Sequence, residues 1–520
     1  MKKNFYLLLF VFFGFQVNAQ IINVNPDSNG EPWIIGGWKS PTKAELAQIP
    51  VLKFDKKYKA KVLPEILDNT DLKYFRPIFN QTNGCCAQAS GVAYNFTYEM
   101  NRARNTSANV ATNQYPSHYT YNFLNSGRGS LGSWYFDGWN IIKANGCPSV
   151  DLYGGLAQDT TYWMSGFSDY ETSMNNKVVE NFNIDVSTEQ GLNNLKYWMY
   201  DHGDGSPDGG IVNFAAGISV SGYNIVYDSI ITRWASSVNH AMTFVGWNDL
   251  VGYDVNNDGQ ITNNIDINDD GVVDMKDWER GAMIMVNSWG EYWARSGKAY
   301  VLYRLLALPS SEGGIGTGNM VSSINVREQY TKKLTMRVSM NHSERSRIKI
   351  VAGVSANTSA SEPDYTISFP LFNYQGGLYN MRGENNTDDI EFSLDITSLL
   401  NNINSGENAK FFLQVYEDDK SADASGSITQ FSIVNIDATE FICTQTNVNI
   451  INNDVTTLSV VGSAEFVSPE ITSSSLPLAT QHHDYSTQLL ATGGVAPYNW
   501  GVQHDFEEQS ISKSYPNVNS

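Results

Sequence analysis

The chain contains few cysteines, few basic side chains and no long apolar segment beyond its first 20 residues. Four cysteines among 520 residues are too few for a disulfide framework, so the domains must be held together by packing. Lysine and arginine number 34 against 54 aspartate and glutamate residues, which gives a formal net charge of −20. No local basic patch offsets this charge, which argues against binding to nucleic acid or to an anionic membrane surface.

The start of the chain has the pattern of a secretory signal peptide. Lys2 and Lys3 precede an apolar run from Phe5 to Phe15, and Val17-Asn18-Ala19 offers small residues for cleavage. The run is too short for a membrane span, which needs about 20 apolar residues. We therefore predict a signal peptide over residues 1–19 and a secreted chain, either extracellular or on the cell surface.

Residue patterns divide the remainder into an α+β part and an all-β part. Residues 20–62 are too short for a large domain and form a short propeptide or an N-terminal extension. Residues 63–325 mix helical and strand patterns and contain nine of the 12 tryptophans, which predicts one large core. In residues 326–462 apolar side chains alternate, as in Leu334–Met340, which predicts a β-sandwich. Residues 463–520 look like part of a bacterial immunoglobulin-like (Ig-like) module.

Three short segments contain residues suited to nucleophilic catalysis. Cys86 lies where an amphipathic helix is predicted to begin, and the positive end of a helix dipole stabilises a thiolate. His240 enters an apolar strand, and Asn287 ends another in the sequence Asn-Ser-Trp-Gly. Each has a structural explanation when taken alone: an inert buried thiol, a core histidine and a turn-forming asparagine. Together they supply the nucleophile, the base and the orienting side chain of thiol acyl transfer.

The order of these segments resembles that of the papain-like cysteine proteases. The resemblance covers residues 63–307, about half of the chain, and implies a two-lobed catalytic domain with a helical lobe and a barrel-like β lobe. His240 follows Cys86 by 154 residues and Asn287 follows it by 201, because an insertion separates the last two segments. The matching segments are Leu63-Pro64, Asn80-Gln81, Gly84-x-Cys86, Asn239-His240-Ala241 and Asn287-Ser288-Trp289-Gly290.

The resemblance also implies a role for individual residues. Cys86 is the expected nucleophile, with Cys85 as the alternative, and His240 is the expected general acid and base. Asn287 is expected to orient the imidazole of His240. The other implied site residues are Gln81 in the oxyanion hole, Gly132 and Ser133 as substrate contacts, and Trp289 as a substrate contact that shields the His240–Asn287 pair.

Two departures from the family pattern bear on activity. The aromatic residue that normally follows the catalytic cysteine is replaced by Ala87, and Gln81 lies one residue closer to Cys86 than usual. These departures favour an alternative function, that of a catalytically inactive papain-like protein that binds calcium and acts in adhesion or binding. A disulfide between Cys85 and Cys147 is also possible, because the family has a bridge from this loop.

Residues 251–279 form an acidic insertion with two EF-hand-like sequences. Each sequence offers oxygen ligands at positions 1, 3 and 5 and a glycine at position 6, a pattern that suits Ca²⁺. The second loop has carboxylates at positions 9 and 12, whereas the first has Ile265 at position 12. The alternative is a solvated pair of acidic turns; we expect structural calcium that stiffens the catalytic half. The expected ligands are Asp254, Asn256, Asp258, Asp266, Asn268, Asp270, Asp274 and Asp277.

The sequence as a whole predicts a secreted, calcium-stabilised cysteine endopeptidase. Its substrates are expected to be proteins or peptides, hydrolysed through a thioester intermediate without a cofactor for catalysis. Transfer of the acyl group to an amine is another outcome of the same chemistry. The β modules after residue 325 are candidates for binding a glycan or a cell-surface partner, although no binding site in them is apparent.

Overall fold

The structure is a computed structural model that describes residues 22–26, 32–53, 62–219, 224–419, 423–467, 470–473 and 491–492. The predicted signal peptide lies outside these residues, as does most of the predicted Ig-like module. From that module the structure describes two short paired strands, β21 (Glu470–Ile471) and β22 (Ala491–Thr492). Within the described ranges no helix is both long and apolar enough to cross a membrane. The fold is of the α+β class, as predicted.

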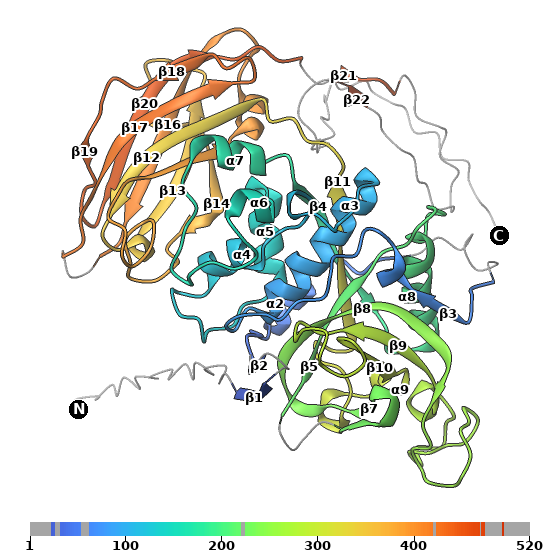
Figure 1. Cartoon of the computed structure of the whole chain (residues 1–520). Coiled ribbons are helices and arrows are strands. Elements are labelled where there is room, and N and C mark those ends of the chain that lie inside the picture. Colours follow the sequence, from blue (N-terminus) through green and yellow to red (C-terminus); the bar gives the residue numbers. More distant parts are fainter. Residues whose placement is uncertain are drawn as a thin grey trace, which may run out of the picture.

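A nine-stranded sheet forms one half of the part that precedes residue 328 (Figure 1). Its strands are β3 (Ile66–Asp68), β4 (Lys177–Asp185), β5 (Val212–Gly217), β6 (Asn224–Val226), β7 (Ile230–Arg233), β8 (Ala235–Gly252), β9 (Arg280–Val286), β10 (Lys298–Leu302) and β11 (Met320–Arg327). They lie in the order β4-β11-β5-β8-β9-β10-β7-β6, with β3 paired to β8. The central pair β8 and β9 is antiparallel, with Thr243 opposite Val286. The sheet therefore brings His240 on β8 near the end of β9, where Asn287 follows.

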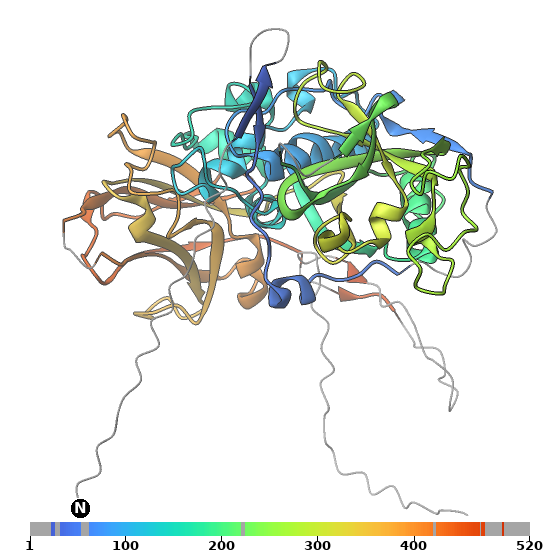
Figure 2. The same ribbon diagram turned by 90° about the horizontal axis from the view of Figure 1, so that it is seen from below.

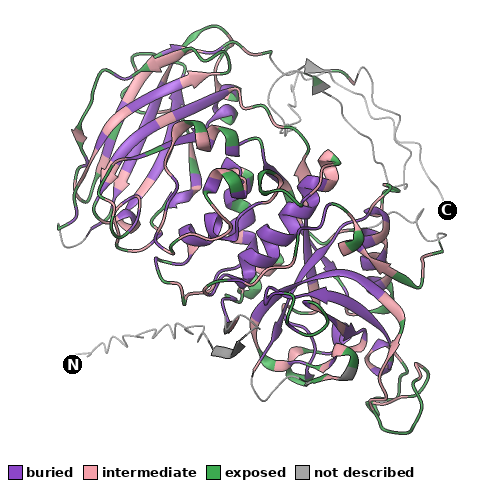
Figure 3. Ribbon diagram, in the orientation of Figure 1, coloured by how far each residue is buried: buried purple, intermediate pink, exposed green. Residues whose placement is uncertain are grey.

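A long helical stretch lies between this sheet and the C-terminal strands. It runs through α2 (Cys86–Gln88), a π-helical segment (Ala89–Phe96) and α3 (Thr97–Arg104). The apolar residues of this stretch have helical spacing and are all buried: Ala89, Val92, Ala93, Phe96 and Met100. Figure 3 shows the stretch as mostly buried. π-Helical turns are often found at functional sites, and this one directly follows Cys86. The other α-helices of the described residues are α1 (Lys43–Ala47), α4 (Ser117–Leu124), α5 (Tyr135–Asn145), α6 (Val150–Tyr153), α7 (Phe167–Ser173), α8 (Glu189–Asp201) and α9 (Arg304–Ala307).

Two antiparallel sheets follow and pack against each other (Figure 1). The first contains β12 (Leu334–His342), β15 (Ile390–Asp395), β17 (Gly426–Asn435), β18 (Glu440–Ile442) and β19 (Val448–Asn449); the second contains β13 (Ile348–Ser355), β14 (Tyr365–Asn373), β16 (Asn408–Glu417) and β20 (Val455–Ser463). Alternate residues of β12, from Leu334 to Met340, are at most 1% exposed, as their period of two predicted. We call this unit the β-sandwich.

The β-sandwich shares one apolar core with residues 86–173, which contain α2 to α7 and which we call the helical part. Phe372 on β14 contacts Phe392 within the β-sandwich, with ring centroids 4.3 Å apart. Its ring also lies 5.5 Å from that of Phe123 and 5.4 Å from that of Trp163, both in the helical part. Lys177, the first residue of β4, and Asp395, the last residue of β15, form a buried ion pair that also ties the nine-stranded sheet to the β-sandwich. The β-sandwich is therefore a packed extension of the helical part.

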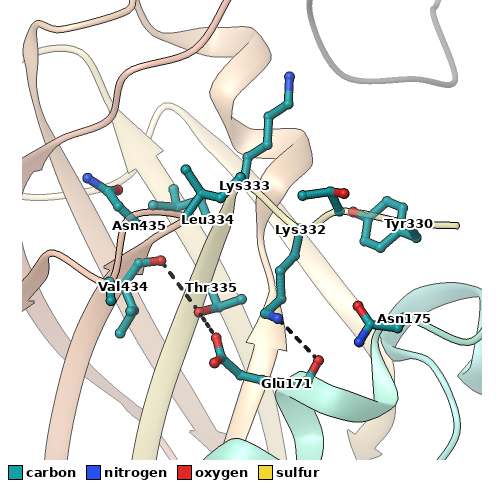
Figure 4. A pocket seen from close by; sticks show the side chains of 12 residues that line it. Glu171, Asn175, Tyr330, Lys332, Lys333, Leu334, Thr335, Val434 and Asn435 are labelled. Carbon is teal, nitrogen blue, oxygen red and sulfur yellow. Dashed lines mark hydrogen bonds between the residues drawn. The ribbon is translucent and has the colours of Figure 1, made fainter.

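The contact of α7 with the β-sandwich leaves a small pocket of about 200 Å³ (Figure 4). Glu171 on α7 closes one side of this pocket. Its carboxylate accepts a hydrogen bond from Thr335 Oγ1 at 3.0 Å, and its carbonyl oxygen accepts one from Lys332 Nζ at 3.3 Å. These bonds fasten α7 to β12 and the residues just before it.

Replacing Phe372 with alanine is expected to destabilise both parts together. The ring is 1% exposed, and its loss leaves a cavity between residues of the helical part and the β-sandwich. We expect a loss of about 3–5 kcal/mol in the free energy of unfolding, with one unfolding transition retained. Denaturant titration measures this, with Tyr365→Ala as the control because Tyr365 is 53% exposed on the same strand. A loss equal to that of the control would contradict the shared core.

Candidate active site

The two adjacent cysteines point to different sides of the helix start. Cys86 faces β8, where its Sγ accepts a hydrogen bond from the main-chain N–H of Ala241 at 3.4 Å. Cys85 faces α4: its Sγ donates to Thr82 O at 3.1 Å and lies 3.9 Å from Ser117 Oγ. Cys86 is therefore the thiol beside the strand that carries His240.

The imidazole of His240 is held by the side chain of Asn287. His240 Nε2 donates to Asn287 Oδ1 at 2.9 Å, and the same oxygen accepts the Ser288 N–H at 2.8 Å. The Ser288 N–H identifies this atom of Asn287 as the acceptor oxygen, so the imidazole must donate to it. The neutral ring therefore carries its proton on Nε2 and has its lone pair on Nδ1. Nδ1 is buried and has no hydrogen-bond partner among the described residues. It is the free basic atom of the site.

Trp289 and Gln81 lie beside this pair. The Trp289 ring lies 4.9 Å from the His240 ring and is 2% exposed, so it excludes water from the His240–Asn287 bond. Gln81 is fixed by its carbonyl side-chain oxygen, which accepts the Ser288 hydroxyl, and by Nε2, which donates to Asn83 O at 3.0 Å. A side-chain amide has two N–H donors, so one remains for a further acceptor.

Residues 33–39, which we call the strap, lie across the site. Ser133 N–H donates to Gly37 O and Lys39 N–H donates to Ser133 O, both at 3.0 Å, as in a parallel strand pair. Trp38 N–H donates to Asn239 O, next to His240, at 3.3 Å. The predicted substrate contact Ser133 thus binds the main chain of the protein's own N-terminal segment. Figure 2 shows this segment passing from the β1–β2 hairpin (Ile22–Pro26 and Pro32–Ile35) on one face to α1 on the other.

Aromatic side chains anchor the strap at both ends. Trp33 stacks on Trp289, with ring centroids 6.2 Å apart, and Trp289 Nε1 donates to Ile34 O at 2.8 Å. At the other end the Trp38 ring lies 5.0 Å from the ring of Tyr135, at the start of α5. The strap is thus held by contacts to both halves of the site.

Gly37 sits where no side chain fits. Its φ is +103°, a conformation that favours glycine, and a Cβ added there would lie 2.1 Å from the carbonyl oxygen of Gly84. Gly84 is two residues before Cys86. The close approach of two main chains therefore depends on glycine in the strap.

Burial favours the neutral forms of Cys86 and His240. Cys86, His240 and Asn287 are fully buried. Burial raises the pKa of the Cys86 thiol and lowers the pKa of His240 to about 4, against the smaller upward effect of the Asn287 hydrogen bond. The pKa of Cys85 is raised by burial to about 12. Both pKa shifts disfavour a thiolate–imidazolium pair in this form, because burial penalises the charged state of each group.

All four cysteines are free, although a Cys85–Cys147 bridge was a possible pairing. The Cys85 thiol is directed to Thr82 and Ser117, and Cys147 is buried in the apolar core of the helical part. The helical part is held by packing without this bridge.

The acidic insertion forms two similar loops between β8 and β9. In each loop the position-1 carboxylate accepts the N–H of the position-6 glycine: Asp254 from Gly259 at 2.9 Å and Asp266 from Gly271 at 2.8 Å. Asp258 and Asp270 at position 5 each accept the N–H two residues further on. The two loops therefore fold alike, as their sequences predicted.

The structure supplies a carboxylate that the sequence pattern of the first loop lacks. Glu279 Oε1 accepts the N–H groups of Val255 and Asn256, positions 2 and 3 of the first loop, at 2.7 and 3.3 Å. Asp277 Oδ1 accepts the corresponding N–H groups of residues 267–268 in the second loop at 3.0 and 3.2 Å. Glu279 thus occupies in the first loop the place that Asp277 occupies in the second. Its distance from Asp254 in the sequence hides it from a 12-residue pattern.

The donor set of these loops fits a hard cation only in part. Asp266 Oδ1 is buried without a hydrogen-bond partner among the described residues, as expected of an oxygen that faces a cation. No three histidine, cysteine, aspartate or glutamate side chains in the described ranges are grouped to hold a metal ion. A cation here would therefore depend also on amide and main-chain carbonyl oxygens, which Ca²⁺ accepts as ligands.

Comparison with known proteins finds similarity among solved structures. No protein-family model and no curated protein matches the chain. The bromelain protease from Ananas comosus matches at 14% identity and a TM-score of 0.35, over 51% of this chain and all of its own. Xylellain, a cysteine protease from Xylella fastidiosa, matches at 15% and 0.37, over 59% and 98%. Procathepsin B from Trypanosoma congolense matches at 12% and 0.37, over 56% and 86%. These neighbours are papain-like cysteine proteases of low identity.

The low pKa of His240 predicts a loss of stability in mild acid. The unfolded chain binds a proton at a histidine pKa of about 6.5, whereas folded His240 binds one only near 4. The free energy of unfolding should therefore fall as the pH drops from about 6.5 to about 4, by up to about 3 kcal/mol from this group. His240→Gln should show a shallower fall in denaturant titrations across this range. Equal slopes in the two proteins would contradict the burial of a neutral imidazole.

Proposed function

We propose that this chain is a secreted cysteine endopeptidase held in a latent form by its strap. The observation that carries the proposal is that two halves of the molecule supply a buried thiol at a helix start and an oriented base on the strand that this thiol contacts. Cys86 begins a helix and touches the main chain of β8, and His240 on that strand is oriented by Asn287. A nucleophile, a base and an orienting group held in this way are the parts of thiol acyl transfer.

In the proposed reaction, His240 Nδ1 takes the proton of the Cys86 thiol. The sulfur attacks the carbonyl carbon of a peptide bond, and a tetrahedral intermediate forms with its charge on the carbonyl oxygen. The second N–H of Gln81 and the main-chain N–H of Cys86 are the proposed donors to that oxygen. The carbon–nitrogen bond then breaks, and the amine leaves with the proton from His240.

The resulting thioester between Cys86 and the acyl part of the substrate is hydrolysed by water. His240 Nδ1 takes a proton from the water, whose oxygen bonds to the carbonyl carbon. The carbon–sulfur bond breaks and the proton returns to the sulfur, which leaves a carboxylic acid product. Gly132 and Ser133 are the proposed main-chain contacts of the substrate, since Ser133 binds the strap by both its N–H and its carbonyl group.

Residues 20–62 act in this proposal as a short propeptide. The role is supported by the hydrogen bonds between the strap and Ser133, by the stacking of Trp33 on Trp289 and by the full burial of Cys86. A substrate main chain and the strap would compete for the same N–H and carbonyl groups of Ser133. Displacement of the strap is therefore required before a peptide can reach the sulfur.

Gly37→Ala should open the site without altering any proposed catalytic residue. A methyl group there meets Gly84 O at 2.1 Å, so the strap no longer fits its place. We expect peptide hydrolysis to rise about a hundredfold over the unprocessed parent, because overpacking and a strained φ together cost about 2–4 kcal/mol. The double variant Gly37→Ala/Cys86→Ala should hydrolyse no peptide. Cleavage of a mixed peptide library, followed by mass spectrometry, measures both.

Gly205→Ala is the matched control. Gly205 also has a positive φ of +89°, but an added Cβ meets nothing within 4 Å. The Gly205→Ala variant should therefore stay latent. A folded Gly37→Ala protein without hydrolytic activity would contradict the proposed peptidase and favour the alternative of an inactive calcium-binding protein. Products joined to an added amine would indicate transfer in place of hydrolysis.

We further propose that the insertion at residues 251–279 binds structural calcium. One support is that the two loops fold alike, with Asp277 and Glu279 in equivalent places. The other is that Asp266 Oδ1 is buried without a hydrogen-bond donor among the described residues. The loops join β8 to β9, so a bound cation would tie together the strands that lead to His240 and Asn287. Glu279 is added to the eight residues expected from the sequence. Secretion and a glycan or cell-surface partner for the β modules stay predictions from the sequence.

Calcium is expected to raise the melting temperature of the parent protein. Binding at a hundredfold excess over the dissociation constant contributes about 2.7 kcal/mol, which corresponds to a rise of about 5 °C if residues 63–325 unfold as one unit. Glu279→Gln should lose part of this rise and Asp266→Asn most of it, whereas Asp151→Asn, at an exposed position of α6, should keep it. Differential scanning calorimetry with and without calcium measures the effect. An unchanged melting temperature in the parent protein would refute calcium binding.

A further inference from the structure

The loop that carries the substrate contacts Gly132 and Ser133 is fastened at two points. This loop, residues 125–133, joins α4 to α5. Near the catalytic cysteine, Gly129 O accepts the N–H of Gly84 at 2.7 Å. Tyr121 Oη on α4 bonds the carbonyl oxygens of Gly129 and Leu131 at 3.0 and 2.8 Å. This end of the loop therefore sets the position of Gly132 and Ser133, which we call the substrate edge, and of the turn before Cys86.

The other end of the loop is held by the β-sandwich. A Cβ added to Gly127 would lie 2.1 Å from the ring of Tyr379, so the ring packs directly on the main chain of the loop. A Cβ added to Gly377 would lie 2.4 Å from the carbonyl oxygen of Ser126. Both contacts come from the segment after β14. The substrate loop thus rests on a surface that belongs to the β-sandwich.

Arg345 fixes this segment of the β-sandwich. The guanidinium is fully buried and donates to main-chain carbonyl groups: Nε and Nη2 to Gly376 O at 2.9 and 2.7 Å, and Nη1 to Thr161 O at 2.6 Å. Its main-chain N–H donates to Tyr379 O at 2.9 Å. The charge lies 4.0 Å from the ring centre of Trp163. One side chain thus joins the support of the loop to the helical part.

The contact to Thr161 leads back to the same loop. The neighbouring residue, Thr160, accepts a hydrogen bond on its carbonyl oxygen from Asn125 Nδ2 at 2.9 Å. Asn125 Oδ1 in turn accepts the N–H of Gly127 at 2.7 Å. The start of the loop is therefore held from two directions, by Tyr379 directly and by Arg345 through Thr161.

We propose that Arg345 and Tyr379 are positioning residues for the substrate edge, which makes the β-sandwich part of the catalytic machinery. The inference rests on the proposed function, because it assigns the edge at Gly132 and Ser133 to substrate binding. The two residues act through the loop and touch neither substrate nor sulfur. Their effect is on where the edge lies relative to Cys86, so substrate affinity should respond more than the rate of the chemical step.

The test uses the Gly37→Ala chain, in which the site is open. Tyr379→Ala removes the ring beneath Gly127, and Tyr379→Phe keeps it. We expect Tyr379→Ala to raise KM about tenfold and to leave kcat within about twofold. A shift of the loop by about 1 Å would misplace the main-chain groups of Ser133 that bind the substrate. Tyr379→Phe should match the parent. Leu458→Ala, in the core of the β-sandwich away from the loop, controls for general destabilisation and should leave KM unchanged.

A binding measurement separates this inference from the proposed function. A synthetic peptide of residues 32–40 should bind the Gly37→Ala chain through Ser133, and calorimetry measures its affinity without any hydrolysis. Tyr379→Ala should weaken this binding about tenfold, and Leu458→Ala should not. If Tyr379→Ala fails to fold, Gly377→Ala displaces the loop from the same side and should have the same effect. Peptide affinity within twofold of the parent in the folded variant would overturn the inference, whether or not the chain hydrolyses peptides.

Discussion

The contact between the sulfur of Cys86 and the main chain of β8 joins the two halves on which the site depends. The helix that begins at Cys86 comes from one half and the strand with His240 from the other. Neither half contains a complete set of reacting groups. Asn287 enters through β9, whose register with β8 brings the amide oxygen to the imidazole. The proposed peptide hydrolysis therefore requires that this contact between helix and sheet be kept.

In the proposed latent form, the strap blocks the site through the same geometry. Its main chain pairs with Ser133, its tryptophans pack at both ends, and glycine at position 37 allows the close approach to Gly84. Desolvation under the strap opposes charge separation between thiol and imidazole, which the pKa shifts of both groups express. The proposed latency and the pKa shifts of the two groups would thus have one physical cause, the burial of a site made of two halves.

The sequence predicted those features of the structure that depend on residues close together in the chain. The period of two in β12 and the repeated ligand spacing of the acidic loops gave the correct elements. The helical spacing after Cys86 did not reveal the π-helical segment, since the same residues are buried in either helix type. Glu279, the strap over Cys86 and the support of the substrate loop by Tyr379 all depend on contacts between distant segments. The sequence has no periodic signal for such contacts.

The most direct measurement is covalent labelling of the Gly37→Ala protein with a thiol-reactive epoxide, followed by peptide mapping. The reagent tests whether one sulfur is both reachable and activated by the neighbouring imidazole. We predict one adduct per chain, on Cys86, that is lost in the variant that also carries His240→Gln. Labelling of Cys85 in place of Cys86, or no labelling of the folded open protein, would contradict the account.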